Sequence, residues 1–119
     1  MVTKAADVWA YREAAWISKE LNGFEVEAAD GEIGKIDECT RDTAAGHIVV
    51  DTGPWIFGRK VMLPAGVIRD VDFDSQKVFV DRTKHEIKHA PEFKEGGQED
   101  AGYRTDLGRY YGTPRDESF

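Results

Sequence analysis

The chain has 119 residues, a formal charge of −7 at pH 7 and a hydrophobic content of 40%, which suits one ordinary globular domain. An acidic chain is repelled by the phosphate backbone of nucleic acids, and the one local basic cluster, Arg59-Lys60, is too small to follow that backbone. No apolar run approaches the ~20 residues of a membrane-spanning helix. We therefore expect no nucleic acid as partner and no insertion into a membrane.

The first region, residues 1–20, has helical spacing of its aromatic residues Trp9, Tyr11 and Trp16. Because aromatic residues fall on more than one side, the region is predicted to be either a short helix lying on the domain or an extended arm. Charged residues interrupt it, so it lacks the apolar segment of a secretion signal. A single cysteine, Cys39, excludes an intramolecular disulfide. We therefore expect a cytoplasmic protein.

The second region, residues 21–93, carries short β-patterned segments separated by turn residues. Asp30-Gly31 and Ala45-Gly46 tolerate the positive φ that hairpin turns require. The predicted strands are 24–28, 32–41, 47–51, 59–64, 67–73 and 77–81. Their alternating apolar residues are predicted to form the core: Ile33, Ile36, Val50, Val61, Leu63, Val78 and Val80. Strands this short and closely spaced favour a small, strongly bent all-β barrel over a large open sheet.

The third region, residues 94–119, is rich in charge and glycine and is predicted to be partly ordered. Tyr103, Leu107 and the pair Tyr110-Tyr111 have the spacing of a short amphipathic helix. These side chains, like the N-terminal aromatic residues, are too apolar for free tails. We expect both ends to pack on their own domain or on a second copy, giving a homodimer or larger assembly. The alternative is disorder at both ends of a monomer.

Several motifs stand in order over residues 21–93. They are Leu21-x-Gly23, Asp30-Gly31-Glu32-Ile33-Gly34-Lys35-Ile36-Asp37, Val49-Val50-Asp51-Thr52-Gly53, Gly58-Arg59-Lys60-Val61-Met62-Leu63-Pro64, Val78-x-Val80-Asp81 and Thr83-x5-His89-Ala90-Pro91-Glu92-Phe93. Together they resemble the PRC-barrel family, which is named after the cytoplasmic barrel of the photosynthetic reaction centre H subunit. A related barrel belongs to a 16S ribosomal RNA processing factor.

The resemblance implies a six-stranded, mostly antiparallel barrel used for protein–protein contact, without a family-wide catalytic residue. The sequence itself predicts a short helix after the last strand, which begins at Thr83 and is stopped by Pro91, and we expect no cofactor. The ends, with Trp9-x-Tyr11-Arg12 and Tyr103-Arg104-x3-Gly108-x-Tyr110-Tyr111-Gly112, are similar to those of stand-alone bacterial members. Neither the reaction-centre role nor the ribosomal role transfers, because the sequence carries neither the membrane helix of the one nor the N-terminal domain of the other.

His85-Glu86-Ile87-Lys88-His89 matches H-E-x-x-H, in which two histidines on one helix face bind zinc and the glutamate acts as general base. Pro91 ends such a helix directly after the second histidine. Glu86 also follows Thr83 by three residues, which is the spacing of a capping box. We therefore favour a solvated helical turn without hydrolase activity. A metal-binding or metallohydrolase domain remains the alternative.

A second candidate metal site is an acidic segment with the spacing of a calcium loop, in which Asp70, Asp72 and Asp74 would bind the ion and Asp81 would close the loop. Serine replaces the glycine of the sharp turn, and both flanks are β-patterned. A hairpin turn at Asp74-Ser75-Gln76 explains the same residues, and we favour it.

Trp55, Ile56 and Phe57 lie on a connection between predicted strands, where polar residues are the norm. They are predicted to be either a plug in one end of the barrel or a docking patch with Arg59 on its rim. The other interface candidates are Trp9, Trp16, Tyr103, Tyr110 and Tyr111. His47 follows a turn glycine and is predicted to be exposed. The sequence thus favours a non-catalytic binding or scaffold module whose partner is a protein, including a second copy of itself.

Overall fold

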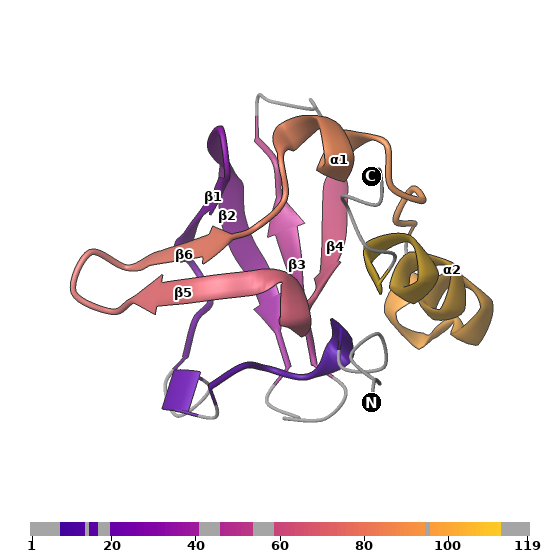
Figure 1. The fold of residues 1–119 in the computed structure, drawn as a ribbon, viewed down its shortest axis with the longest axis horizontal. Coiled ribbons are helices and arrows are strands. Elements are labelled where there is room, and N and C mark those ends of the chain that lie inside the picture. The colour runs from indigo at the N-terminus through magenta and orange to yellow at the C-terminus, as the bar shows by residue number, and fades with distance from the viewer. Residues whose placement is uncertain are drawn as a thin grey trace, which may run out of the picture.

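The computed structural model describes residues 8–13, 15–16, 20–40, 46–53, 59–94 and 96–112 (Figure 1). Six strands form one sheet in the order β4-β3-β2-β1-β6-β5. They are β1 (Glu25–Ala28), β2 (Gly31–Cys39), β3 (His47–Asp51), β4 (Lys60–Pro64), β5 (Ile68–Asp72) and β6 (Lys77–Val80). Two α helices, α1 (Lys84–Lys88) and α2 (Ala101–Gly112), follow the strands. In this described part of the chain, no helix has the length and apolar character needed to cross a membrane.

The sheet is mixed. β1 and β6 pair in parallel, whereas the other neighbouring strands pair in antiparallel fashion. Short connections reverse the chain and so produce antiparallel pairs, but β1 and β6 are far apart in the sequence and no hairpin sets their direction. The prediction of a small, sheet-rich fold with six strands and a short helix is therefore confirmed. The sheet is mixed, and among the described residues its strands are not shown to close into a barrel.

Three register shifts accompany the strong bending of the sheet. They lie between Val26 and Glu27, between Ile36 and Glu38, and between Ile68 and Asp70. Such bulges increase the local twist of the strands that carry them. Figure 1 shows the result, with β5 and β6 running across the direction of β3 and β4. The 3₁₀ helix η3 (Ala65–Val67) connects the two edge strands, β4 and β5.

The predicted core is confirmed, since all seven residues are at most 8% exposed: Ile33, Ile36, Val50, Val61, Leu63, Val78 and Val80. β3 and β4 are buried on both faces, because Val49 and Met62, which point to the opposite side from Val50 and Val61, are also buried. Strands covered on both faces read as continuous apolar runs, as in 48–50 and 61–63. α2 lies beside β4 on the outer side of the sheet (Figure 1).

The described parts of both ends lie on their own sheet, which is one of the two arrangements that the sequence predicted. The Tyr11 hydroxyl donates to the carbonyl of Thr40 at 2.7 Å. At the other end, the predicted helix is present as α2, and the Arg82 guanidinium donates to the carbonyl of Tyr111 at 2.7 Å. These contacts join the ends to the residue directly after β2 and to the segment after β6.

The hairpin between β5 and β6 is the predicted one. Asp72 Oδ1 accepts hydrogen bonds from the N–H groups of Asp74 and Ser75, at 3.0 and 3.2 Å, and Gln76 adopts a left-handed φ of 59°. Hydrogen bonds from Ser75, together with the one from Asp74, hold the pKa of Asp72 below its ordinary value. This carboxylate therefore stabilises the turn.

Candidate functional site

The H-E-x-x-H segment forms α1, and its glutamate caps the helix. Glu86 Oε1 accepts the backbone N–H of Thr83 at 2.8 Å, and the Glu86 N–H donates to Thr83 Oγ1 at 3.1 Å. The predicted capping box is therefore confirmed. The helix ends at His89, whose ring lies against that of His85 with centroids 4.1 Å apart. Glu86 is thus held at the start of α1.

The two candidate metal segments lie in separate places of the fold. His85 belongs to α1 and His89 follows it directly, whereas Asp70 and Asp72 belong to β5 and Asp74 to the following turn. Within the residues that the structure describes, no group of three or more His, Cys, Asp or Glu side chains is arranged to hold a metal ion.

Removing the cap of α1 should lower stability measurably. Thr83→Ala is expected to reduce the free energy of unfolding by about 1 kcal/mol, because the N–H of Glu86 loses its acceptor. Urea denaturation measures the change. Thr105→Ala, at an exposed position of α2, is the matched control and should change it by less than about 0.5 kcal/mol. Equal effects of the two substitutions would contradict the capping role.

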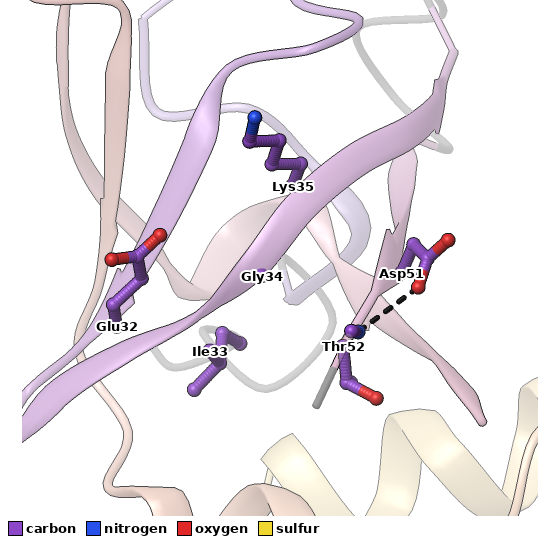
Figure 2. Close-up of a pocket in the computed structure, with 7 residues that line it drawn as sticks. Glu32, Ile33, Gly34, Lys35, Asp51 and Thr52 are labelled. Carbon is purple, nitrogen blue, oxygen red and sulfur yellow. Dashed lines mark hydrogen bonds between the residues drawn. The ribbon is translucent and has the colours of Figure 1, made fainter. Parts of the chain in front are cut away.

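A pocket of about 470 Å³ opens where β2 passes the end of β3 (Figure 2). The described residues that line it are Glu32, Ile33, Gly34, Lys35, Asp51, Thr52 and Gly53. Figure 2 shows Lys35 and Ile33 extending to opposite sides of the strand, with Glu32 further along it. Ile33 is buried, whereas Glu32 and Lys35 are exposed. The pocket therefore combines an apolar wall with a charged rim.

The backbone of β2 comes unusually close to the end of β3 at this pocket. Gly34 has a φ of +150°, and a Cβ atom placed there would lie 2.1 Å from the carbonyl oxygen of Asp51. No residue with a side chain fits without moving the backbone. Nearby, Thr52 Oγ1 donates to the carbonyl of Arg59 at 2.7 Å, and the N–H of Gly53 donates to Asp51 Oδ1 at 3.0 Å. These bonds anchor the beginning of the β3–β4 connection.

The rim charges differ from their neighbours in having no ion-pair partner among the described residues. Elsewhere on the same sheet Lys60 pairs with Asp37 at 2.8 Å and Lys77 pairs with Glu27 at 3.2 Å. Among the described residues, neither the Lys35 ammonium nor the Glu32 carboxylate has an oppositely charged group within 4.0 Å. The rim therefore presents charges of both signs to solvent.

His47 is buried, so the prediction that it is exposed was wrong. Its side chain is 6% exposed, and its Nδ1 atom lies 3.3 Å from Nη1 of Arg104 on α2. The Arg104 guanidinium in turn lies 4.2 Å from the ring centroid of Trp9. Burial, and then the charge of Arg104, lower the pKa of His47 below its ordinary value. His47 and Val49 lie on the same face of β3. The uninterrupted apolar residues 48–50 therefore indicated, in the sequence, that both faces of this strand are covered.

The aromatic interface candidates take different positions. Trp16 and Tyr111 are buried, Trp9 and Tyr103 are half-buried, and Tyr110 is exposed, although its hydroxyl donates to the carbonyl of Glu86 at 2.7 Å. Arg59 is half-buried, 3.9 Å from Glu92 Oε2. Trp55, Ile56 and Phe57 lie outside the described residues. Most of the described candidates therefore contact the rest of the same chain.

No protein-family model matches this chain, and no curated protein is similar enough in sequence to count as a relative. Its function therefore has to be argued from the geometry and the residues.

Proposed function

We propose that this chain is a non-catalytic, PRC-barrel-like binding module that associates with a second copy of itself through the rim of the β2–β3 pocket. The observation that carries the proposal is the presence of two exposed charges of opposite sign, Glu32 and Lys35, beside an apolar pocket wall, with no ion pair to either charge among the described residues. The barrel-like fold is supported by the motifs over residues 21–93 and by η3, which joins the two edge strands of the bent sheet.

A rim with both signs of charge suits a two-fold interface, because such an interface places the same patch of both copies face to face. Lys35 of one copy can then pair with Glu32 of the other, and the same pair recurs on the far side of the axis. Electrostatic complementarity of this kind sets the register of an interface more than its total affinity. The net charge of −7 makes local pairing necessary, since two copies otherwise repel each other.

A non-catalytic role is supported by the chemistry of the pocket. Its described lining includes neither histidine nor cysteine, and its one hydroxyl, on Thr52, donates to the carbonyl of Arg59. Trp55, Ile56 and Phe57 follow the pocket residue Gly53 closely in the sequence, and their role as a docking patch stays a prediction. A cytoplasmic location belongs to the same proposal and is supported by the single cysteine.

Reversing the charges of the rim tests the proposal. Lys35→Glu alone and Glu32→Lys alone are each expected to weaken self-association roughly ten- to a hundredfold, because two attractive pairs become repulsive. An equimolar mixture of the two variants should associate again, since each acidic rim then faces a basic one. Sedimentation velocity of each variant and of the mixture measures the change.

Two substitutions at exposed sites away from the pocket serve as controls. Lys94→Glu and Glu99→Lys change the net charge by the same amounts as the two rim variants, and neither residue lines the pocket. Both controls should associate like the wild type. If the controls weaken association as much as the rim variants do, or if the mixture of rim variants stays monomeric, the proposed interface is wrong.

A further inference from the structure

His47 lies buried where three parts of the chain meet, namely β3, α2 and the N-terminal segment. Its Nδ1 atom is 3.3 Å from Arg104 Nη1. A guanidinium can only donate hydrogen bonds, so Nδ1 is the acceptor and the ring proton lies on Nε2. The Nε2 atom is buried and has no hydrogen-bond partner within the part of the chain that the structure describes. The imidazole of His47 is therefore neutral in this arrangement.

Arg104 connects this imidazole to the N-terminal segment. Its guanidinium lies over the ring of Trp9 at 4.2 Å, a favourable cation–π distance. The carbonyl of Trp9 accepts the N–H of Gly46, the residue directly before β3, at 2.6 Å. Close packing extends along α2, because a Cβ atom at Gly108 would lie 2.7 Å from Nε1 of Trp9. One side chain, Arg104, thus joins the helix, the segment and the strand.

We propose that protonation of His47 releases α2 and Trp9 from the outer face of β3 and β4. A proton on Nδ1 removes the acceptor of the Arg104 hydrogen bond and leaves two cations in contact at a site with little access to water. Separation of α2 from the sheet relieves that repulsion and hydrates both charges. It also uncovers Val49 and Met62, which are buried on the face that His47 shares.

The charged groups around His47 determine the direction of the pH dependence. Burial and then the charge of Arg104 on α2 disfavour the protonated imidazole. The carboxylate of Glu38 on β2 favours it, but its effect is smaller than either of these two. The Tyr11 hydroxyl lies 3.5 Å from the backbone carbonyl oxygen of His47. We call the arrangement with α2 packed on the sheet the closed state and the arrangement after its separation the released state. The pKa of His47 is lower in the closed state than in the released state, where it returns to about 6.5.

The closed state is accordingly favoured above that pH and loses stability as the pH falls below it. Each pH unit in this window shifts the ratio of closed to released molecules by up to tenfold, until the lower pKa of the closed state is reached. The inference concerns α2 and Trp9 and not the rim of the pocket, so it stands or fails independently of the proposed self-association.

Hydrogen exchange measured by NMR on the full chain tests the inference. The amide protection of Leu107, in the middle of α2, should fall by up to tenfold per pH unit below about pH 6.5, after correction for intrinsic exchange. His47→Gln, which cannot titrate, should remove this dependence. His85→Gln is the matched control, because His85 is exposed on α1, and should leave the dependence as in the wild type.

A titration of the wild-type imidazole covers the case in which His47→Gln does not fold. The ring carbon shifts of His47 and the protection of Leu107 should change over the same pH range. Protection that changes over a different range, that does not change at all, or that changes equally in a folded His47→Gln variant would overturn the inference.

Discussion

Gly34→Ala is expected to lower the free energy of unfolding by about 3 kcal/mol or more. The added Cβ atom would lie 2.1 Å from the carbonyl oxygen of Asp51, and the backbones of the paired strands β2 and β3 fix the positions of both atoms. Neither can rotate away as a flexible side chain would, so β2 and β3 must separate at the pocket. Urea denaturation followed by tryptophan fluorescence measures the loss.

Gly53→Ala is the matched control for that substitution. Gly53 also has a positive φ, +56°, but a Cβ atom there meets nothing within 4 Å. Its replacement should therefore show only the cost of the left-handed conformation, about 1–2 kcal/mol. Equal losses at the two glycines would mean that the close approach of Gly34 to Asp51 does not determine the effect.

Leu63→Ala should destabilise the domain by about 2–5 kcal/mol, a large share of the stability of a small protein. Leu63 is fully buried and lies opposite Ile48 in the β3–β4 pair, so its truncation leaves a cavity in the core beside Ile48. Chemical denaturation again provides the measurement. Lys94→Ala, at an exposed site, should change stability by less than about 0.5 kcal/mol. A loss below about 1 kcal/mol for Leu63→Ala would contradict the placement of Leu63 on a buried face of β4.

The strands could be predicted closely because their signals are local. β3 has the predicted bounds, and β6 ends one residue early at Val80. Turn residues and alternation act over a few positions, so they locate hairpins well. The parallel pairing of β1 with β6 could not be found in this way, because the two strands are separated by four others in the sequence and the pairing depends on how the whole sheet bends.

The candidate sites also divide into local features, which the sequence predicted, and contacts between distant residues, which it did not. The capping role of Glu86 and the turn at Asp72 were predictable, since each involves residues within a few positions of one another. The burial of His47 depends on Arg104, which lies 57 residues further along the chain. That the described residues form no ion pair with Glu32 or Lys35 likewise becomes apparent only when the neighbouring strands and their ion pairs are in place.

The measurement that tests the proposed function most directly is isotope-filtered NMR on a mixture of labelled and unlabelled wild-type protein, which detects only contacts between copies. We predict such contacts at residues 32–35 and 51–53, on the rim of the pocket, and none at α2. Contacts between copies that lie on α2 instead, or a protein that remains monomeric at the concentrations NMR requires, would contradict self-association through this rim.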